Sequence, residues 1–388
     1  MKVLAVLSSW YPHYTSSSVG VVVDQISIRL RKVGINVDIC APIGGNVNII
    51  NPNVLKRTRI FEPADHFYRM IYFWFKAVYY IKNNYEKYDL FWVHNPNPII
   101  WRFVNKKLLD KIIFTIHTTY GGVSKKSNFE SIKLNIFYDF MKKNEKKFFK
   151  KIKSIKNRII VFSPECIKEL TDFGIEDKKI VYIPNGVDIN YFKPISSEMK
   201  RNIRIKFGFP QNKIIMLSLG RLDEVKKPIK LIKTFLALEK HCDNIFLIVI
   251  GKGDELPKIK KMTEKNKNIL IMGYVNIMEE GNADIIACCD AYITASSYEG
   301  QPLALLESMS SGLLCITSKI PNLEKIVRSA KCGISLSFDD AEQAADEINN
   351  FFKMNKIAIF GLNARRYIEN NHDWDIVSNK YLEEFNKR

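Results

Sequence analysis

Residues 291–317 read AYITASSYEGQPLALLESMSSGLLCIT, and the fold can be argued outward from this stretch. The apolar runs at its ends, residues 291–294 and 313–317, are typical of strands buried on both faces of a sheet. Between them, Pro302 suits the first turn of a helix and Gly312 suits its end. The stretch therefore predicts two parallel strands joined by a right-handed helical crossover.

The same pattern recurs along the whole chain. Further apolar runs lie at residues 3–7, 37–40, 90–93, 112–116 and 159–162, and again at 214–219, 245–250 and 269–272. A turn signal at residues 184–186, followed by Pro194, separates the two halves. A chain of 388 residues also favours about two domains. We predict an α/β protein with two Rossmann-like, doubly wound domains facing a central cleft. The first would span residues 1–190 and the second 191–369, with a C-terminal helix at about 370–388 packing back on the first.

Composition narrows the class of protein. The seven cysteines include no C-x-x-C pair, so neither a disulfide framework nor a zinc site is expected, and free thiols favour a cytoplasmic location. The longest apolar stretch, residues 71–81, is interrupted by Lys76 and is far too short to cross a membrane. The formal net charge of +18 is compatible with a soluble Lys-rich surface or with an anionic partner.

One segment concentrates this charge. Residues 141–158 carry nine Lys or Arg against one Glu, with Phe148, Phe149, Ile152 and Ile155 interspersed. This is either the solvated face of a helix or a basic amphipathic surface for anionic lipid at the inner face of the cell membrane. A nucleic-acid surface is the weaker alternative, since no recognised binding module accompanies it, and we expect no nucleic-acid partner.

Two segments follow predicted strands, at the sheet edge where open α/β sheets bind ligands. In residues 299–312, the amides from Gly300 to Ala304 would point out of a helix N-terminus and form an anion site for a diphosphate. Glu299 and Glu307 could accept hydrogen bonds from sugar and ribose hydroxyls. An ordinary loop and helix is the alternative interpretation.

The second segment is residues 220–228, GRLDEVKKP. Arg221 and Lys226 could grip phosphate oxygens and stabilise a leaving diphosphate without a metal ion. We expect no D-x-D motif of the kind with which GT-A enzymes hold a metal anywhere in the chain, and therefore no metal. Two ordinary surface cations are the alternative interpretation.

Taken together, these segments resemble the retaining glycosyltransferases of family 4, which have the GT-B fold. Glu299 and Glu307 reproduce the E-x7-E motif, and Gly220-Arg221 with Lys226 reproduces G-R-x-x-x-x-K. Residues 183–188, IPNGVD, and 249–253, VIGKG, match the family in the same order. The resemblance covers essentially the whole chain and is strongest from residue 181 to residue 327.

The resemblance implies a role for each matching residue. Arg221 and Lys226 would bind the donor diphosphate, Glu307 the ribose, and Glu299 the donor sugar. His117 would lie beside the reacting sugar, so the implied catalytic residues are His117, Glu299, Arg221 and Lys226. The implied donor contacts are completed by Gly20, in a loop after the first strand, and by Gly251, Tyr274, Gly300, Gln301, Pro302 and Leu303. The chain departs from the family at Val19-Gly20, where two glycines are usual, and at Gln301-Pro302, where an aromatic residue and glycine are usual.

The expected function is a retaining, metal-independent hexosyltransferase that requires no cofactor. Its donor would be a nucleotide-sugar bound mainly by the second domain, with a UDP-sugar favoured over a GDP-sugar. The first domain would bind a glycan or lipid-linked glycan acceptor, in bacterial surface polysaccharide synthesis. Its aromatic run at residues 67–80 and its basic run at residues 141–158 are predicted to dock the enzyme on the inner face of the membrane. The alternatives are a GT-B nucleotide-sugar 2-epimerase and a non-catalytic sugar-nucleotide-binding protein.

Overall fold

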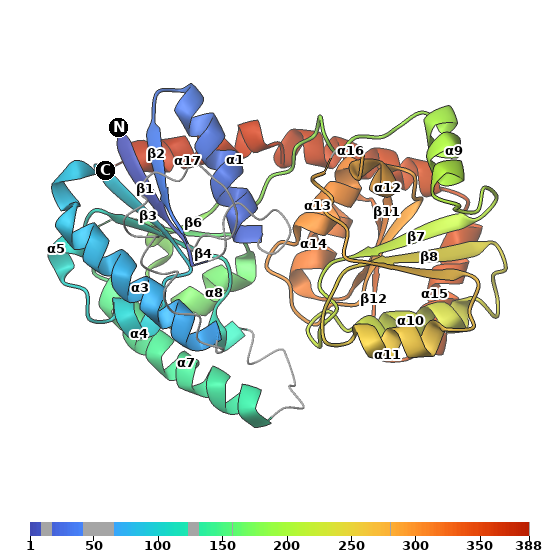
Figure 1. The fold of residues 1–388 in the computed structure, drawn as a ribbon, viewed down its shortest axis with the longest axis horizontal. Helices are drawn as coiled ribbons and strands as arrows, with labels where there is room; N and C mark the ends of the chain where they lie inside the picture. The colour runs from blue at the N-terminus through green and yellow to red at the C-terminus, as the bar shows by residue number, and fades with distance from the viewer. Residues whose placement is uncertain (9–17, 42–65, 123–131, 157, 280, 388) are drawn as a thin grey trace. The chain divides into compact units, whose positions relative to one another are not determined.

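The computed structural model describes residues 1–8, 18–41, 66–122, 132–156, 158–279 and 281–387. The chain divides into two compact units (Figure 1). Unit 1 comprises Met1–Asn185 and Trp374–Arg388, and unit 2 comprises Gly186–Asp373.

Unit 1 is built on a parallel sheet with the strand order β2-β1-β3-β4-β5-β6. The order reverses between β1 and β3, which makes this edge of the sheet a topological switch point. Its strands are β1 (Lys2–Val6), β2 (Asn36–Cys40), β3 (Leu90–His94), β4 (Ile112–Ile116), β5 (Ile159–Val161) and β6 (Ile180–Tyr182). Its helices are α1 (Ser18–Lys32), α3 (His66–Asn83), α4 (Pro98–Trp101), α5 (Lys106–Leu109), α7 (Ile132–Ile152), α8 (Pro164–Asp172) and α17 (Trp374–Asn386), with 3-10 turns η2 (Tyr85–Lys87) and η3 (Asp177–Lys179).

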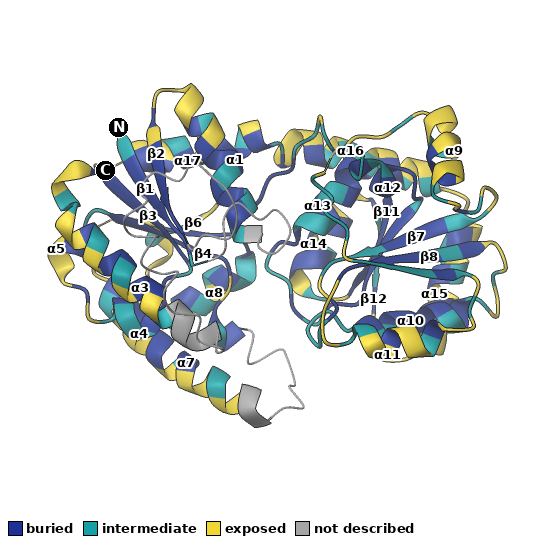
Figure 2. Cartoon of the chain, viewed as in Figure 1, coloured by how far each residue is buried: buried dark blue, intermediate teal, exposed yellow. Residues whose placement is uncertain are grey.

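Helices cover both faces of this sheet. On one face, Trp74 of α3, Trp101 of α4 and Phe148 of α7 belong to one hydrophobic core with the strands. On the other face, the C-terminal helix α17 packs beside α1, and its Tyr381 ring lies 5.2 Å from that of Trp92 on β3. Because both faces are covered, the strands are buried along nearly their whole length (Figure 2).

Unit 2 has a second parallel sheet, with the order β9-β8-β7-β10-β11-β12. Its switch point lies between β7 and β10. Its strands are β7 (Ile214–Leu219), β8 (Ile245–Ile250), β9 (Ile269–Gly273), β10 (Ala291–Thr294), β11 (Leu314–Ser318) and β12 (Gly333–Leu336). Its helices are α9 (Ser197–Lys206), α10 (Pro228–Leu238), α11 (Leu256–Thr263), α12 (Ala283–Ala287), α13 (Leu303–Ser310), α14 (Pro321–Ala330), α15 (Ala341–Lys353) and α16 (Ile357–Asn371).

Two cores sandwich the second sheet. Helices α12, α13, α14 and α16 contribute to one core, and α10, α11 and α15 to the other. The class predicted from the sequence, two doubly wound α/β units, is confirmed. Each predicted apolar run coincides with a strand to within a residue at either end. The predictions missed β6 and β12, which are edge strands with mostly half-buried residues.

The lipid-facing interpretation of residues 141–158 is wrong in one respect. Phe148, Phe149, Ile152 and Ile155 are all buried in the core of unit 1. They form the inner side of α7 and of the turn that follows it, so they are not available to lipid. The exposed residues of this segment, among those described, are polar: they are Lys143, Lys146, Lys147, Lys150, Lys153, Ser154, Lys156 and Arg158.

Candidate active site

The switch point of unit 2 brings the two motif segments together. The loop after β10 is tied to the loop after β7, because the amide and hydroxyl of Ser297 both donate to the carbonyl of Val225, at 2.8 and 3.0 Å. Asp223 organises the second loop by accepting from the amides of Val225 and Lys226, each at 3.1 Å. Residues far apart in the sequence thus form one surface at the carboxyl ends of β7 and β10.

Lys226 and Glu299 meet directly in this surface. Lys226 Nζ is hydrogen-bonded to Glu299 Oε1, which also accepts from the Ser296 hydroxyl at 2.7 Å. The Glu299 side chain is only 9% exposed, and that of Lys226 is 21% exposed. A carboxylate this enclosed needs such partners, because desolvation would otherwise penalise its charge.

Arg221 lies in the opposite situation. Its side chain is 68% exposed, and its Nη1 makes an ion pair with Asp223 Oδ2 at 2.5 Å. A guanidinium exposed to this degree can rearrange toward a phosphate at little cost, since a surface ion pair is worth under about 1 kcal/mol.

Helix α13 presents its N-terminus at the same place. No described side chain caps the helix, whose N-cap position is Pro302. Asn322 fixes the preceding turn, since its Nδ2 donates to the carbonyls of Glu299 at 2.7 Å and Gly300 at 2.9 Å. The helix starts one residue later than predicted, immediately after Pro302, so the first-turn amides begin at Leu303.

Glu307 lies on α13, just over one turn from its start. Its side chain keeps some solvent exposure, but burial of the carboxyl raises its pKa to about 7. This carboxyl is therefore poised between its two protonation states near neutral pH, which is frequent at functional sites.

The other predicted donor contacts vary in what they offer. A Cβ on Gly251 would lie 1.8 Å from the carbonyl oxygen of Gly220, so Gly251 allows the loops after β7 and β8 to touch. Tyr274 is exposed, with Lys252 Nζ 4.5 Å from its ring centroid. Gln301 is buried, and its Nε2 lies 3.5 Å from His372 Nδ1. The Gln301 side chain therefore packs inside unit 2, against His372.

His117 belongs to unit 1, where it directly follows β4. Its Nε2 shares a 2.9 Å hydrogen bond with Nδ1 of His94, the last residue of β3. Its ring also packs against Phe162, with centroids 4.3 Å apart. Burial lowers the pKa of His117 to about 3, and burial together with His117 lowers that of His94 well below its usual range. Both imidazoles are therefore neutral at physiological pH.

The sequence predicted Gly20 in a loop, but Gly20 lies in the first turn of helix α1, where it is buried. The helix begins at Ser18 and residues 9–17 lie outside the described residues, so the predicted approach of this loop to the donor stays a prediction.

No group of three or more His, Cys, Asp or Glu side chains that could hold a metal ion occurs within the described ranges. A D-x-D triplet does occur at residues 373–375, outside both motif segments. Its Asp375 Oδ1 accepts from Arg29 Nε at 2.5 Å and so ties α17 to α1. The second aspartate of this triplet therefore has a structural role, as the partner of Arg29 in unit 1.

Sequence reasoning missed the residues that assemble the unit 2 site. Asp223, Ser296, Ser297 and Asn322 hold the loops and the start of α13, as their hydrogen bonds show. For Asp223 a signal was present, because Asp in a short loop readily accepts from amides two and three residues later. Ser296 also acts locally, on Glu299 three residues later, whereas Ser297 and Asn322 act on partners distant in sequence and carry no local signal.

Comparison with known proteins agrees with this geometry. The family model described as glycosyl transferases group 1 matches residues 199–373, and glycosyltransferase family 4 matches residues 19–191. An uncharacterized glycosyltransferase of Methanocaldococcus jannaschii is 30% identical over 294 residues, covering 74% of this chain and 69% of the relative.

Two further proteins are informative. The UDP-Gal:alpha-D-GlcNAc-diphosphoundecaprenol alpha-1,3-galactosyltransferase of Escherichia coli is 27% identical over 294 residues, covering 74% of this chain and 72% of the relative. The crystal structure of WaaG, a glycosyltransferase involved in lipopolysaccharide biosynthesis, aligns over 100% of both chains with a TM-score of 0.77 at 16% identity. The second likeness concerns the fold.

Proposed function

Since the chain belongs to glycosyltransferase family 4 and has the GT-B fold, we propose that it is a retaining, metal-independent enzyme using a nucleotide-sugar donor. The site in unit 2 would hold the donor, and a UDP-sugar is favoured because the E. coli relative is named for UDP-Gal. A GDP-sugar is the second choice. The acceptor would be a glycan or lipid-linked glycan in bacterial polysaccharide synthesis, because the E. coli relative is named for a sugar-diphosphoundecaprenol acceptor.

The observation that carries this proposal is the convergence of Arg221, Lys226 and the α13 N-terminus at one switch point. When the bond to the sugar breaks, negative charge grows on the departing diphosphate. Two cations and the partial positive charge of a helix N-terminus stabilise that charge without a metal ion or cofactor. Glu307 would accept hydrogen bonds from the ribose hydroxyls.

Retention follows best from attack on the face that the leaving group vacates, with the leaving phosphate taking the acceptor proton. His117 is unsuited to act as a general acid at neutral pH, because its pKa is lowered to about 3. Glu299 is held by Lys226 and Ser296, which favours a role in orienting the donor sugar over that of a covalent nucleophile.

We propose that unit 1 contacts the membrane through the two segments predicted from the sequence, residues 67–80 and 141–158, with exposed aromatic side chains of the first in place of the buried phenylalanines of the second. Helices α3 and α7 and the turn that follows α4 expose large apolar side chains, while lysines line the outer side of α7. No described helix is long and apolar enough to cross a bilayer. We expect peripheral binding to anionic lipid at the inner face of the cell membrane. The exposed residues, named here the apolar patch, are Tyr72, Phe75, Tyr79, Phe103, Ile136 and Phe140.

Flotation with vesicles tests this contact. The protein should float with vesicles of phosphatidylcholine and phosphatidylglycerol, and less with phosphatidylcholine alone. Phe75→Ser with Tyr79→Ser should reduce flotation, whereas Ile359→Ser, an exposed apolar residue in unit 2, should not. Equal recovery with and without anionic lipid would remove the proposed electrostatic contribution.

The catalytic proposal is tested with a donor panel. Calorimetry with UDP, GDP, ADP and their common sugars should give binding of one nucleotide at about micromolar strength. Transfer to a sugar-diphospholipid acceptor should then yield a product whose anomeric coupling in NMR matches that of the donor. Activity should survive a chelator such as EDTA. An inverted product or a chelator-dependent rate would each overturn the corresponding part of the proposal.

A further inference from the structure

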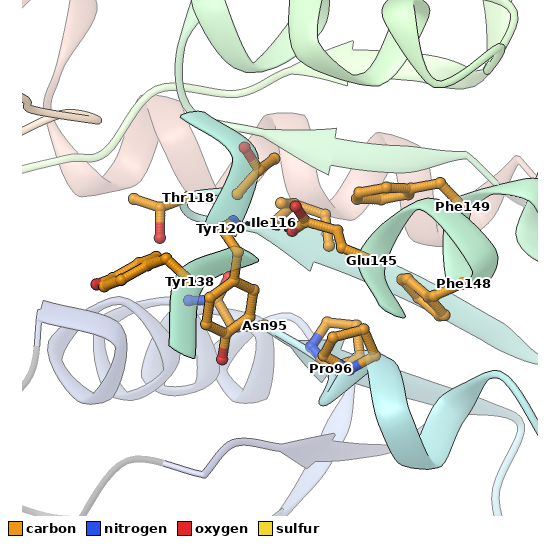
Figure 3. Close-up of a pocket in the computed structure, with 11 residues that line it drawn as sticks. Asn95, Pro96, Ile116, Thr118, Tyr120, Tyr138, Glu145, Phe148 and Phe149 are labelled. Carbon is orange, nitrogen blue, oxygen red and sulfur yellow. Dashed lines mark hydrogen bonds between the residues drawn. The ribbon is translucent and has the colours of Figure 1, made fainter. Parts of the chain in front are cut away.

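Unit 1 contains a pocket that the donor site in unit 2 does not explain. It lies at the ends of β3 and β4 and against α7, beside the residue that follows His117 (Figure 3). Its cavity volume is about 140 Å³, so the pocket is small and open to solvent, and a single small ring is the size of ligand to consider.

Two tyrosines form the aromatic part of its wall. Tyr120 and Tyr138 are half-buried, and their ring centroids are 6.1 Å apart with planes inclined by 56°. Figure 3 shows Phe148 and Phe149 on the opposite side of Glu145. Tyrosine offers a flat apolar face with a hydroxyl at its tip, which suits a ring with C–H faces and a rim of hydroxyls.

The polar groups of the pocket suit hydroxyls as well. Glu145 is buried, and its oxygens accept from the amides of Tyr120 at 3.0 Å and Gly121 at 2.9 Å. Each carboxyl oxygen retains a second lone pair that can accept another hydrogen bond. The exposed Thr118, also in the lining, can both donate and accept.

The charge of the pocket decides between ligand classes. Glu145 is the one acid among the described lining residues, and these include no Lys, Arg or His. Burial raises the pKa of Glu145 to about 7, although the two amides and Lys142 act in the opposite direction. Among the described lining residues, a phosphate or carboxylate would meet a carboxyl and no cation, whereas a hydroxyl can pair with either form of the carboxyl.

We propose that this pocket binds an uncharged sugar ring of the acceptor. This inference rests on the proposed function, and it narrows the acceptor to a glycan whose reacting end is a neutral sugar. Phosphorylated sugars and small carboxylic acids should bind this pocket less well than neutral sugars, because its described lining offers them a carboxyl and no cation. The pocket follows directly on His117, the residue expected beside the transferred sugar.

Saturation-transfer NMR on the full-length protein tests the pocket. The probes are methyl α-glucoside, methyl α-galactoside and methyl N-acetyl-α-glucosaminide as uncharged sugars, with glucose 1-phosphate and L-malate as anions. UDP is present throughout, and its own binding is followed by calorimetry in the same samples. At least one uncharged glycoside should receive saturation, and neither anion should.

Two substitutions locate the binding. Tyr138→Ala should weaken the glycoside at least about tenfold, and Thr118→Val should weaken it roughly threefold through one lost hydrogen bond. Phe140→Ala is the matched control, because Phe140 is an exposed aromatic residue of α7 outside the pocket. Thermal midpoints close to that of the unaltered protein establish that the variants fold, and Thr118→Val serves if Tyr138→Ala does not.

Three results would overturn the proposal: binding of an anion in preference to every glycoside, glycoside binding unaffected by both substitutions, or no response from any glycoside. Each of these counts against the pocket when UDP still binds. Loss of all nucleotide binding by the unaltered, folded protein would instead count against the proposed donor site.

Discussion

Replacing Arg221 by alanine separates catalysis from stability more cleanly than any other change in the site. The side chain is 68% exposed, and its recorded ion pair is with Asp223 at 2.5 Å. An exposed pair of this kind contributes under about 1 kcal/mol to folding, so the thermal midpoint should fall by only a few degrees. Loss of this positive charge should, however, destabilise the transition state, in which negative charge develops on the leaving diphosphate.

The size of that effect follows from comparable transition-state contacts. Removing one preorganised group that stabilises developing charge costs roughly 100- to 1,000-fold in rate, or about 2.7–4 kcal/mol. We therefore expect kcat/KM for the donor to fall by about this factor, and nucleotide affinity to fall together with it. The assay is initial-rate transfer to a lipid-linked acceptor, with calorimetry for UDP and circular dichroism for the fold.

Lys240→Ala provides the matched control. Lys240 makes an exposed ion pair with Glu342 at 2.6 Å, but it follows α10 and precedes β8, at the amino end of the strands. The two variants should show similar thermal midpoints and very different activities. Unchanged kcat/KM in a folded Arg221→Ala protein would refute the assignment of Arg221 to the diphosphate.

Three further predictions concern single residues. The pKa of Glu307 is raised to about 7, so the ionised fraction of its carboxyl near neutral pH grows as pH rises. The affinity for UDP, measured by calorimetry, should therefore increase roughly three- to tenfold between about pH 6 and about pH 8. Glu307→Gln should abolish this pH dependence, and its persistence in the variant would contradict the prediction. Gly251→Ala should lower the thermal midpoint and abolish UDP binding, because the new Cβ would lie 1.8 Å from the Gly220 carbonyl oxygen. Gly208→Ala is the control: Gly208 has a φ of +70° and open space around it, so this change should lower the free energy of unfolding by only about 1–2 kcal/mol. His117 should stay neutral in NMR titration from about pH 8 to about pH 5, since its pKa is about 3, and a titration near 6.5 would show that its ring is solvated.

Most of the fold could be predicted because its strands are buried on both faces. A run such as residues 245–250 is apolar throughout, and the observed strand has the same bounds. Strands β6 and β12 were not predicted; both are short edge strands, of three and four residues, so each offers only a brief signal. The burial of Phe148 and Ile152 was readable, since they lie four residues apart on the apolar side of a helix.

In the candidate site too, features set by nearby residues could be predicted from the sequence, and contacts between distant residues could not. Glu299 and Glu307 could be identified because their spacing is fixed by a single loop and helix. The joining of the two loops by Ser297 and Val225 could not, because these residues are 72 positions apart in sequence and meet only when β7 and β10 become neighbours. Likewise, the sequence shows His94 and His117 separately, and only the pairing of β3 with β4 places their rings in contact.

Arg221 and Lys226 look equivalent in the motif, but their surroundings give them different physical roles. Lys226 compensates the enclosed carboxylate of Glu299, and removing one partner of a buried pair costs about 3–5 kcal/mol because it leaves an uncompensated charge. An arriving diphosphate would therefore share Lys226 with Glu299 rather than take it away. Arg221 does not compensate a buried charge in this way, because its partner Asp223 also accepts hydrogen bonds from two loop amides. Loss of activity on replacing Lys226 would combine a damaged site with a lost phosphate contact, whereas loss on replacing Arg221 reports the phosphate contact alone. The two cations of one motif thus act differently, one by holding the sugar-binding carboxylate in place and the other by meeting the leaving group.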